Sequence, residues 1–176
     1  MAPALARMLL LAVAAGPLAS APPEEELKAA LVLSLARFAD WPHLKADAPI
    51  RIGVAGRADF VPVLARMIAG RLGAGGRRLE AKAVKTPADA EGCQILYFSA
   101  LSPKDIKTTI EAIRNEGVIT VGDHERFLES GGAIHLFEED GRIAFEVRLD
   151  ALDPGVTISA KLLKLGHIVG PRGSLP

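Results

Sequence analysis

Residues 117–152 read GVITVGDHERFLESGGAIHLFEEDGRIAFEVRLDAL, and this stretch decides the fold. It holds three strand patterns: short apolar runs at 118–121 and 133–137, and alternating apolar positions at 142–149. Asp140 and Gly141 separate the last two, and this pair tolerates the positive φ angles of a tight hairpin turn. Asp123 is placed to cap a short helical turn that reaches Phe127 and Leu128. The stretch predicts a sheet that ends in an antiparallel hairpin.

The rest of the chain alternates helices with strands. Leu27, Leu31, Leu35 and Phe38 recur at helical spacing and predict the buried face of a first helix. The full set of predicted elements comprises helices at 24–39, 60–69 (capped by Asp59), 103–116 (capped by Ser102) and 159–169, and strands at 50–55, 78–84, 94–98, 118–121, 133–137 and 142–149. Helices between strands favour crossover connections. The predicted fold class is α/β: a single three-layer α/β/α sandwich with a mixed sheet of about six strands.

Composition indicates a folded domain and gives no sign of nucleic acid binding. Hydrophobic residues make up 49% of the chain and charged residues 24%, which suits a folded domain with a core. Lys plus Arg and Asp plus Glu both number 21, so the global charge does not indicate nucleic acid binding.

The first 21 residues have the three parts of a secretory signal peptide. Arg7 is the basic part, an apolar run covers 8–15, and Ala19-Ser20-Ala21 is a small-residue cleavage site. We therefore expect a signal peptide at 1–21, one α/β domain at 22–170 and a flexible tail at 171–176. The mature protein is expected in a bacterial periplasm.

The sequence contains no recognisable catalytic or metal motif. The four histidines are not spaced for one metal ion, and neither a phosphate-binding loop nor a nucleophile elbow is present. We expect no enzyme activity and no cofactor. Cys93 is the only cysteine, which excludes an internal disulfide. It is expected to be buried in a strand, while an intermolecular bridge that would give a homodimer stays open.

Five residues are the candidate contacts for a partner or ligand: Trp41, Asp123, Arg142, Glu146 and Arg148. Trp41 is interpreted first as a core anchor and second as a recognition residue. Arg142 and Glu146 share one face of the last hairpin strand with Arg148. They can pair on a solvated face or present a fork for a carboxylate.

Several motifs in order resemble one known family, the YfiR family of periplasmic α/β proteins. They are LARFADWP at 35–42, IGVAG at 52–56, CQILYF at 93–98, ITVGD at 119–123 with Phe127 and GGAI at 131–134, Arg142 with FEV at 145–147, and ISAKLLKL at 158–165. The resemblance covers about residues 27–169.

The resemblance implies a regulator that represses a membrane-bound diguanylate cyclase by binding its periplasmic sensor domain. Release of the cyclase would raise cyclic-di-GMP and promote biofilm. The alternative is a periplasmic small-molecule receptor that relays ligand occupancy to a different signalling partner. Two positions depart from the family: Gly53 stands where a cysteine is usual, and Arg148 where an asparagine is usual. The first departure argues against redox control, because Cys93 has no bridge partner. The second argues against a ligand contact of the family type on the hairpin.

Overall fold

The computed structural model describes residues 24–170, so the predicted signal peptide and tail lie outside the described residues. The elements are α1 (Glu24–Phe38), β1 (Ala39–Asp40), β2 (Ile50–Gly56), α2 (Phe60–Ile68), η1 (Ala74–Gly76), β3 (Leu79–Val84), η2 (Pro87–Ala90), β4 (Ile95–Ser99), α3 (Pro103–Ala112), β5 (Ile119–Gly122), β6 (Ile134–Glu139), β7 (Arg142–Arg148), η3 (Leu149–Ala151), β8 (Thr157–Ile158), α4 (Ala160–Leu163) and β9 (His167–Val169). None of the helices within 24–170 is both long enough and apolar enough to cross a bilayer.

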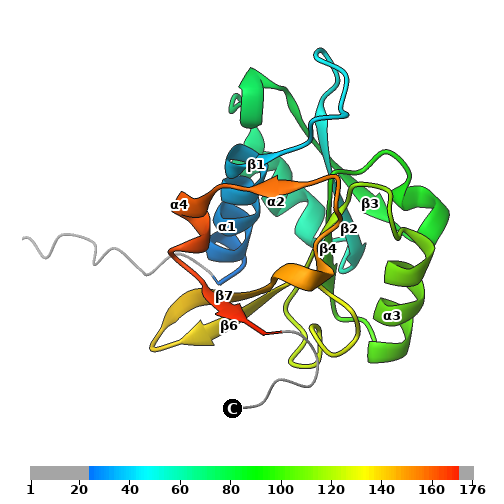
Figure 1. Ribbon diagram of the computed structural model, residues 1–176, viewed down its shortest axis with the longest axis vertical. Coiled ribbons are helices and arrows are strands. Elements are labelled where there is room, and N and C mark those ends of the chain that lie inside the picture. The colour runs from blue at the N-terminus through cyan, green and yellow to red at the C-terminus, as the bar shows by residue number, and fades with distance from the viewer. Residues whose placement is uncertain (1–23, 171–176) are drawn as a thin grey trace, which may run out of the picture.

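One seven-stranded sheet organises the molecule, in the order β3-β2-β4-β5-β6-β7-β9 (Figure 1). The first five strands are parallel, β7 runs antiparallel to β6, and β9 is parallel to β7. A separate pair, β1 and β8, is antiparallel. The predicted mixed α/β sandwich is confirmed, with seven strands in its main sheet instead of about six.

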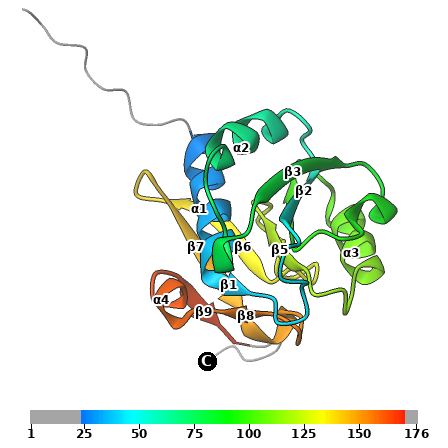
Figure 2. The ribbon, with the colours of Figure 1, turned by 90° about the horizontal axis from the view of Figure 1, so that it is seen from above.

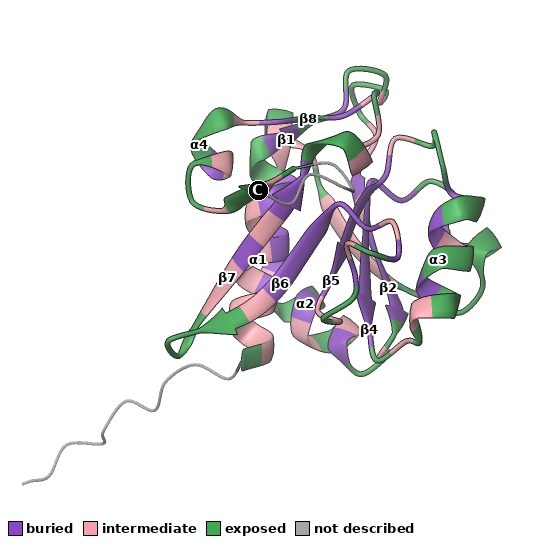
Figure 3. Cartoon of the chain, turned by 60° about the horizontal axis from the view of Figure 1, so that its bottom comes forward, coloured by how far each residue is buried: buried purple, intermediate pink, exposed green. Residues whose placement is uncertain are grey.

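The sheet lies between two helical layers. Figure 2 shows α1 and α2 on one side of the strands and α3 on the other. Alternate residues of each strand feed the two cores: Ile95 and Tyr97 of β4 pack with α1 and α2, while Leu96 and Phe98 pack with α3. The central strands are buried on both faces, whereas the tip of the β6–β7 hairpin is exposed (Figure 3).

The hairpin and its approach form as the sequence predicts. Asp140 and Gly141 have φ angles of 50° and 73°, which suit the tight turn between β6 and β7. The ring of Phe127 is fully buried between Gly122 and Gly132. A Cβ atom would lie 2.4 Å from that ring at Gly122 and 2.1 Å from it at Gly132, so close packing requires glycine at both positions. The predicted cap at Asp123 is wrong, because its carboxylate binds elsewhere.

The predicted C-terminal helix over 159–169 is wrong. Helix α4 ends at Leu163, and His167–Val169 form β9 along the open edge of β7. Gly166 lets the chain between α4 and β9 pass close to Phe145, because a Cβ atom there would lie 2.2 Å from the ring. Pairing β9 with β7 satisfies backbone groups that the hairpin would otherwise leave at a sheet edge.

Two local predictions about the helices also need correction. The buried residues of α1 are Ala29, Val32, Leu33, Leu35 and Ala36. Phe38, predicted on the buried face, is 42% exposed. Asp59 makes no capping bond to α2, because its carboxylate pairs with Arg57 instead. Ser102 does cap α3 by accepting a hydrogen bond from the Asp105 amide.

Candidate functional site

The carboxyl ends of β2, β4 and β5 meet at one edge of the sheet. The chain order reverses there, because β3 lies on one side of β2 and β4 lies on the other. Open α/β sheets usually bind ligands at such a switch point. Three polar residues stand at this edge: Arg57 just after β2, Ser99 at the end of β4, and Asp123 just after β5.

Asp123 is the centre of this cluster. Its Oδ2 atom accepts hydrogen bonds from Lys28 Nζ at 2.9 Å, Tyr97 Oη at 2.8 Å and Ser99 Oγ at 3.0 Å. Tyr97 and Ser99 reach it from the same face of β4, since strand residues two apart point the same way. The Tyr97 ring packs against Phe60 of α2, with centroids 4.6 Å apart, which fixes the hydroxyl at this edge.

The first turn of α1 completes the cluster with two further ion pairs. Lys28 Nζ lies 2.6 Å from Glu24, and Arg57 Nη2 lies 2.6 Å from Glu25. Lys28 is well buried, with 14% of its side chain exposed, and so is Asp123 with 15%. The acidic start of α1 is therefore bound to cations of the helix and of the sheet edge.

The pKa values show how the cluster holds its charges. Burial acts to raise the pKa of Asp123, but the hydrogen bonds from Lys28 and Tyr97 outweigh it and leave that pKa below its ordinary value. Burial acts to lower the pKa of Lys28, yet its bonds to Glu24 and Asp123 leave it raised. Burial, followed by the charge of Asp123, strongly raises the pKa of Tyr97. At neutral pH the lysine and the carboxylate are therefore fixed opposite charges.

The cavity at this edge is small and internally neutralised. Its volume is about 180 Å³. All five charged side chains in its lining form ion pairs within the protein: Glu24, Glu25, Lys28, Arg57 and Asp123. A ligand would have to break these pairs, so we interpret the cluster as a latch that fixes α1 on the sheet.

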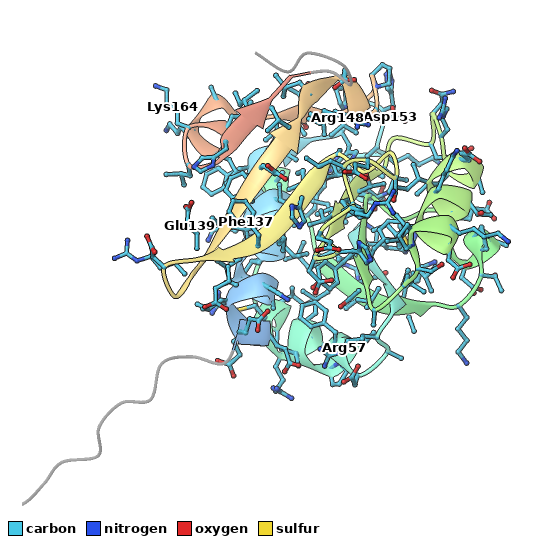
Figure 4. The ribbon with its side chains drawn as sticks, turned by 90° about the horizontal axis from the view of Figure 1, so that it is seen from below. Arg57, Phe137, Glu139, Arg148, Asp153 and Lys164 are labelled. Atoms are coloured by element: carbon cyan, nitrogen blue, oxygen red, sulfur yellow. The ribbon has the colours of Figure 1, made fainter. Side chains whose placement is uncertain are left out.

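The other four candidate contacts are not brought together with Asp123. Trp41 is 6% exposed and its Nε1 donates to the Gly117 carbonyl at 2.9 Å, so its predicted burial is confirmed. Arg142 is exposed at the start of β7. Figure 4 places Arg148 at the opposite end of the sheet from Arg57. The five predicted contacts therefore form no single site.

The predicted face on β7 is also rearranged. Glu146 Oε1 lies 2.9 Å from His135 Nδ1 of the neighbouring strand. This pair takes the place of the predicted contact with Arg142, and no ion pair joins Glu146 to Arg142 within residues 24–170. Arg148 is 8% exposed and donates from Nη1 to the Leu128 carbonyl. The hairpin face thus presents one solvated arginine, not a fork of charged groups.

Sequence reasoning missed Lys28, Tyr97 and Ser99. Each looks ordinary in the sequence, since Lys28 is a helix lysine and the other two lie in a buried strand. The signal that could have found them is topological: polar residues at the carboxyl ends of neighbouring parallel strands. Within residues 24–170, no group of three or more His, Cys, Asp or Glu side chains is arranged to hold a metal ion.

Comparison with known proteins gives a family and a fold. A family model described as YfiR/HmsC-like matches residues 25–167. No curated protein matches the sequence. The chain resembles a crystal structure of a conserved domain protein from Vibrio cholerae O1 biovar El Tor, with a TM-score of 0.54 and 15% identity. That likeness covers 84% of this chain and 60% of the other, and at this identity it shows a shared fold alone.

Proposed function

The chain belongs to the YfiR/HmsC-like family of periplasmic regulatory proteins, and from this membership we propose that it represses a membrane-bound diguanylate cyclase by binding the periplasmic sensor domain of that enzyme. The family match, which spans residues 25–167, is the observation that carries the proposal. The proposal includes export, with the leader at 1–21 removed. Fractionation and N-terminal sequencing check this part, and a mature product that retains the leader would contradict it.

The surface we assign to the cyclase is the segment from α4 to β9, at one edge of the sheet. Leu165 is 76% exposed and Ile168 is 57% exposed, the two highest values among the exposed large hydrophobic residues of the described chain. They lie three residues apart, and β9 has β7 on one side only. Exposed apolar side chains beside an open strand edge are suited to association with another protein.

A pair of leucine variants tests this assignment. Leu165→Ser removes an apolar contact from the proposed surface, and Leu72→Ser does the same at a 55% exposed leucine beside the opposite sheet edge. If Leu165 is a central contact, its replacement should weaken capture of the purified sensor domain by about thirtyfold, the scale of an interface hot spot. It should also raise cellular cyclic-di-GMP, while Leu72→Ser leaves both unchanged.

Two results would contradict the proposal at different levels. Equal losses in the two leucine variants would remove the assigned surface but not the function. Absence of any complex between the wild-type protein and the sensor domain, together with unchanged cyclic-di-GMP on deletion, would remove the function itself.

A small-molecule receptor is the second candidate function. It is favoured by a cleft around Arg148, at the end of the sheet opposite the Asp123 cluster.

A further inference from the structure

A cleft of about 380 Å³ opens at the amino-terminal edge of the parallel strands. It lies between the end of α3 with the residues that follow it, the start of β5 and the segment 148–154, which begins at the last residue of β7. Figure 4 shows Arg148 and Asp153 close together at this end of the sheet. The volume lies within the range of pockets that bind small molecules.

The floor of the cleft carries a buried cation. Arg148 is 8% exposed, its Nη1 donates to the Leu128 carbonyl, and its Nε lies 3.5 Å from Asp150 Oδ1. Asp150 is 48% exposed in its side chain, so water screens much of its attraction for the guanidinium. A ligand carboxylate can therefore take the place of Asp150 beside the guanidinium without leaving an acid buried.

Thr120 and Arg114 add hydrogen-bond donors to the cleft, and one of its two acids, Asp153, is already hydrogen-bonded within the protein. Thr120 Oγ1 accepts a hydrogen bond from the Ala133 amide at 3.0 Å, so its own hydroxyl hydrogen can be donated to a ligand. Arg114 stands exposed at the rim. The carboxylate of Asp153 accepts from the amides of Gly117 and Gly155, which satisfies both of its oxygens within the protein.

Part of the cleft lining is aliphatic and forms an isoleucine-rich wall. It is formed by Ile110, Ile113 and Val118, all at least nine-tenths buried, together with Leu152. No aromatic side chain lines this cleft within the described residues. A ligand that matches it has an anionic end and an aliphatic body.

We propose that this cleft binds a short aliphatic carboxylate. The carboxylate contacts the Arg148 guanidinium and the Thr120 hydroxyl, its chain packs against the isoleucine wall, and Asp150 turns outward into solvent. Guanidinium and carboxylate match in shape and charge, which makes this pairing stronger than a neutral hydrogen bond. The inference names the ligand class of the receptor function and does not depend on repression of a cyclase.

Hexanoate is the probe, and hexanamide is its uncharged control of the same shape. Titration of the purified protein, followed by calorimetry and by the NMR methyl signals of Ile110 and Ile113, should show saturable binding of hexanoate. Hexanamide should bind at least about tenfold more weakly, because it loses a charge-assisted hydrogen bond. Equal affinity for the two compounds, or no saturable shift with millimolar hexanoate, would overturn the proposal.

Three variants locate the site. Arg148→Gln should weaken hexanoate binding at least about tenfold, and unchanged affinity in the folded variant would count against the site. Asp150→Asn removes the competing acid without touching the core and should tighten binding about twofold to fivefold; unchanged or weaker binding would overturn the proposal even if Arg148→Gln fails to fold. Arg142→Gln, at an exposed arginine on the same strand, should leave affinity unchanged, and a loss there would indicate nonspecific charge attraction.

Hexanoate binding and sensor-domain capture are separate readouts, so either can fail without the other.

Discussion

Gly53→Cys should create a disulfide with Cys93. Gly53 lies in β2, and a Cβ atom built there would stand 3.0 Å from Cys93 Sγ. A disulfide with an S–S bond of about 2.05 Å places the Cβ of one residue about 3 Å from the sulfur of the other. The geometry therefore accepts the cysteine that the resemblance places at this position.

The expected gain follows from the closed loop. A bridge from 53 to 93 encloses about 40 residues, and the loss of unfolded-chain entropy is worth about 4 kcal/mol at 25 °C. The new Cβ would also stand 2.8 Å from Leu96 Cδ1 and from Val84 Cγ2, so these side chains must shift. Such overpacking costs about 1–3 kcal/mol, which reduces the net gain over the wild type.

Comparing one variant in two redox states isolates the bridge. Crowding by the added Cβ is present in both states, so oxidised and reduced Gly53→Cys should differ by about 4 kcal/mol, or about 8–16 °C in melting temperature. Burial raises the pKa of the Cys93 thiol. The bridge is therefore best formed during refolding in a glutathione buffer.

Gly53→Ser is the matched control, because it adds the same Cβ and a heteroatom without a second thiol. Its melting temperature should be the same in both buffers. Two free thiols in the oxidised Gly53→Cys sample after denaturation would refute the geometric argument. A bridge that forms but leaves the melting temperature unchanged would refute the stability argument.

Three further predictions concern the wild-type contacts. Trp41→Phe should cost about 1–3 kcal/mol in urea unfolding, because the Gly117 carbonyl loses its indole donor; an unchanged midpoint would show that the bond contributes nothing. Since the pKa of Asp123 is lowered by folding, its contribution is fully present above the unfolded carboxyl pKa of about 4 and is lost as pH falls through the folded value. The stability gap between the wild type and Asp123→Asn should therefore narrow on acidification, and a gap that widens there contradicts the latch. Reductant should leave the wild-type melting temperature unchanged, whereas a dimer on non-reducing gels that collapses with reductant would show that Cys93 forms an intermolecular bridge.

The parts of the fold that were predicted correctly depend on interactions between residues close in the sequence. The β6–β7 turn depends on Asp140 and Gly141 alone, and the α3 cap depends on Ser102 and the amide three residues later.

The errors arose where tertiary packing overrides local preference. The sequence of 159–169 has helical spacing, but the open edge of β7 offers backbone partners that only the folded sheet provides. Helix α1 packs against the sheet, α2 and α4, so its buried residues lie on several sides of the helix and not in the single predicted stripe. Phe38 stays exposed.

The candidate site was only partly predictable for the same reason. Asp123 was selected, but its partner Lys28 lies 95 positions away in the sequence. The distance between them is set by the docking of α1 and not by any motif. Arg148 was selected as a surface contact, whereas the structure buries it beneath a cleft whose other walls come from α3 and β5.

The positions of the cleft and the proposed partner surface suggest how one could affect the other. A ligand changes partner affinity only if it binds two conformations of the protein unequally. Strand β5 lines the cleft, but β4 and β6 hold it on both sides, so it cannot shift alone. Asp150 instead begins the segment that continues through β8 and α4 to Leu165 and Ile168. Outward rotation of Asp150 acts directly on this segment. If hexanoate alters sensor-domain affinity, amide hydrogen exchange should therefore change in residues 149–169 and stay constant in β4 and β5; a change confined to β5 would contradict this route.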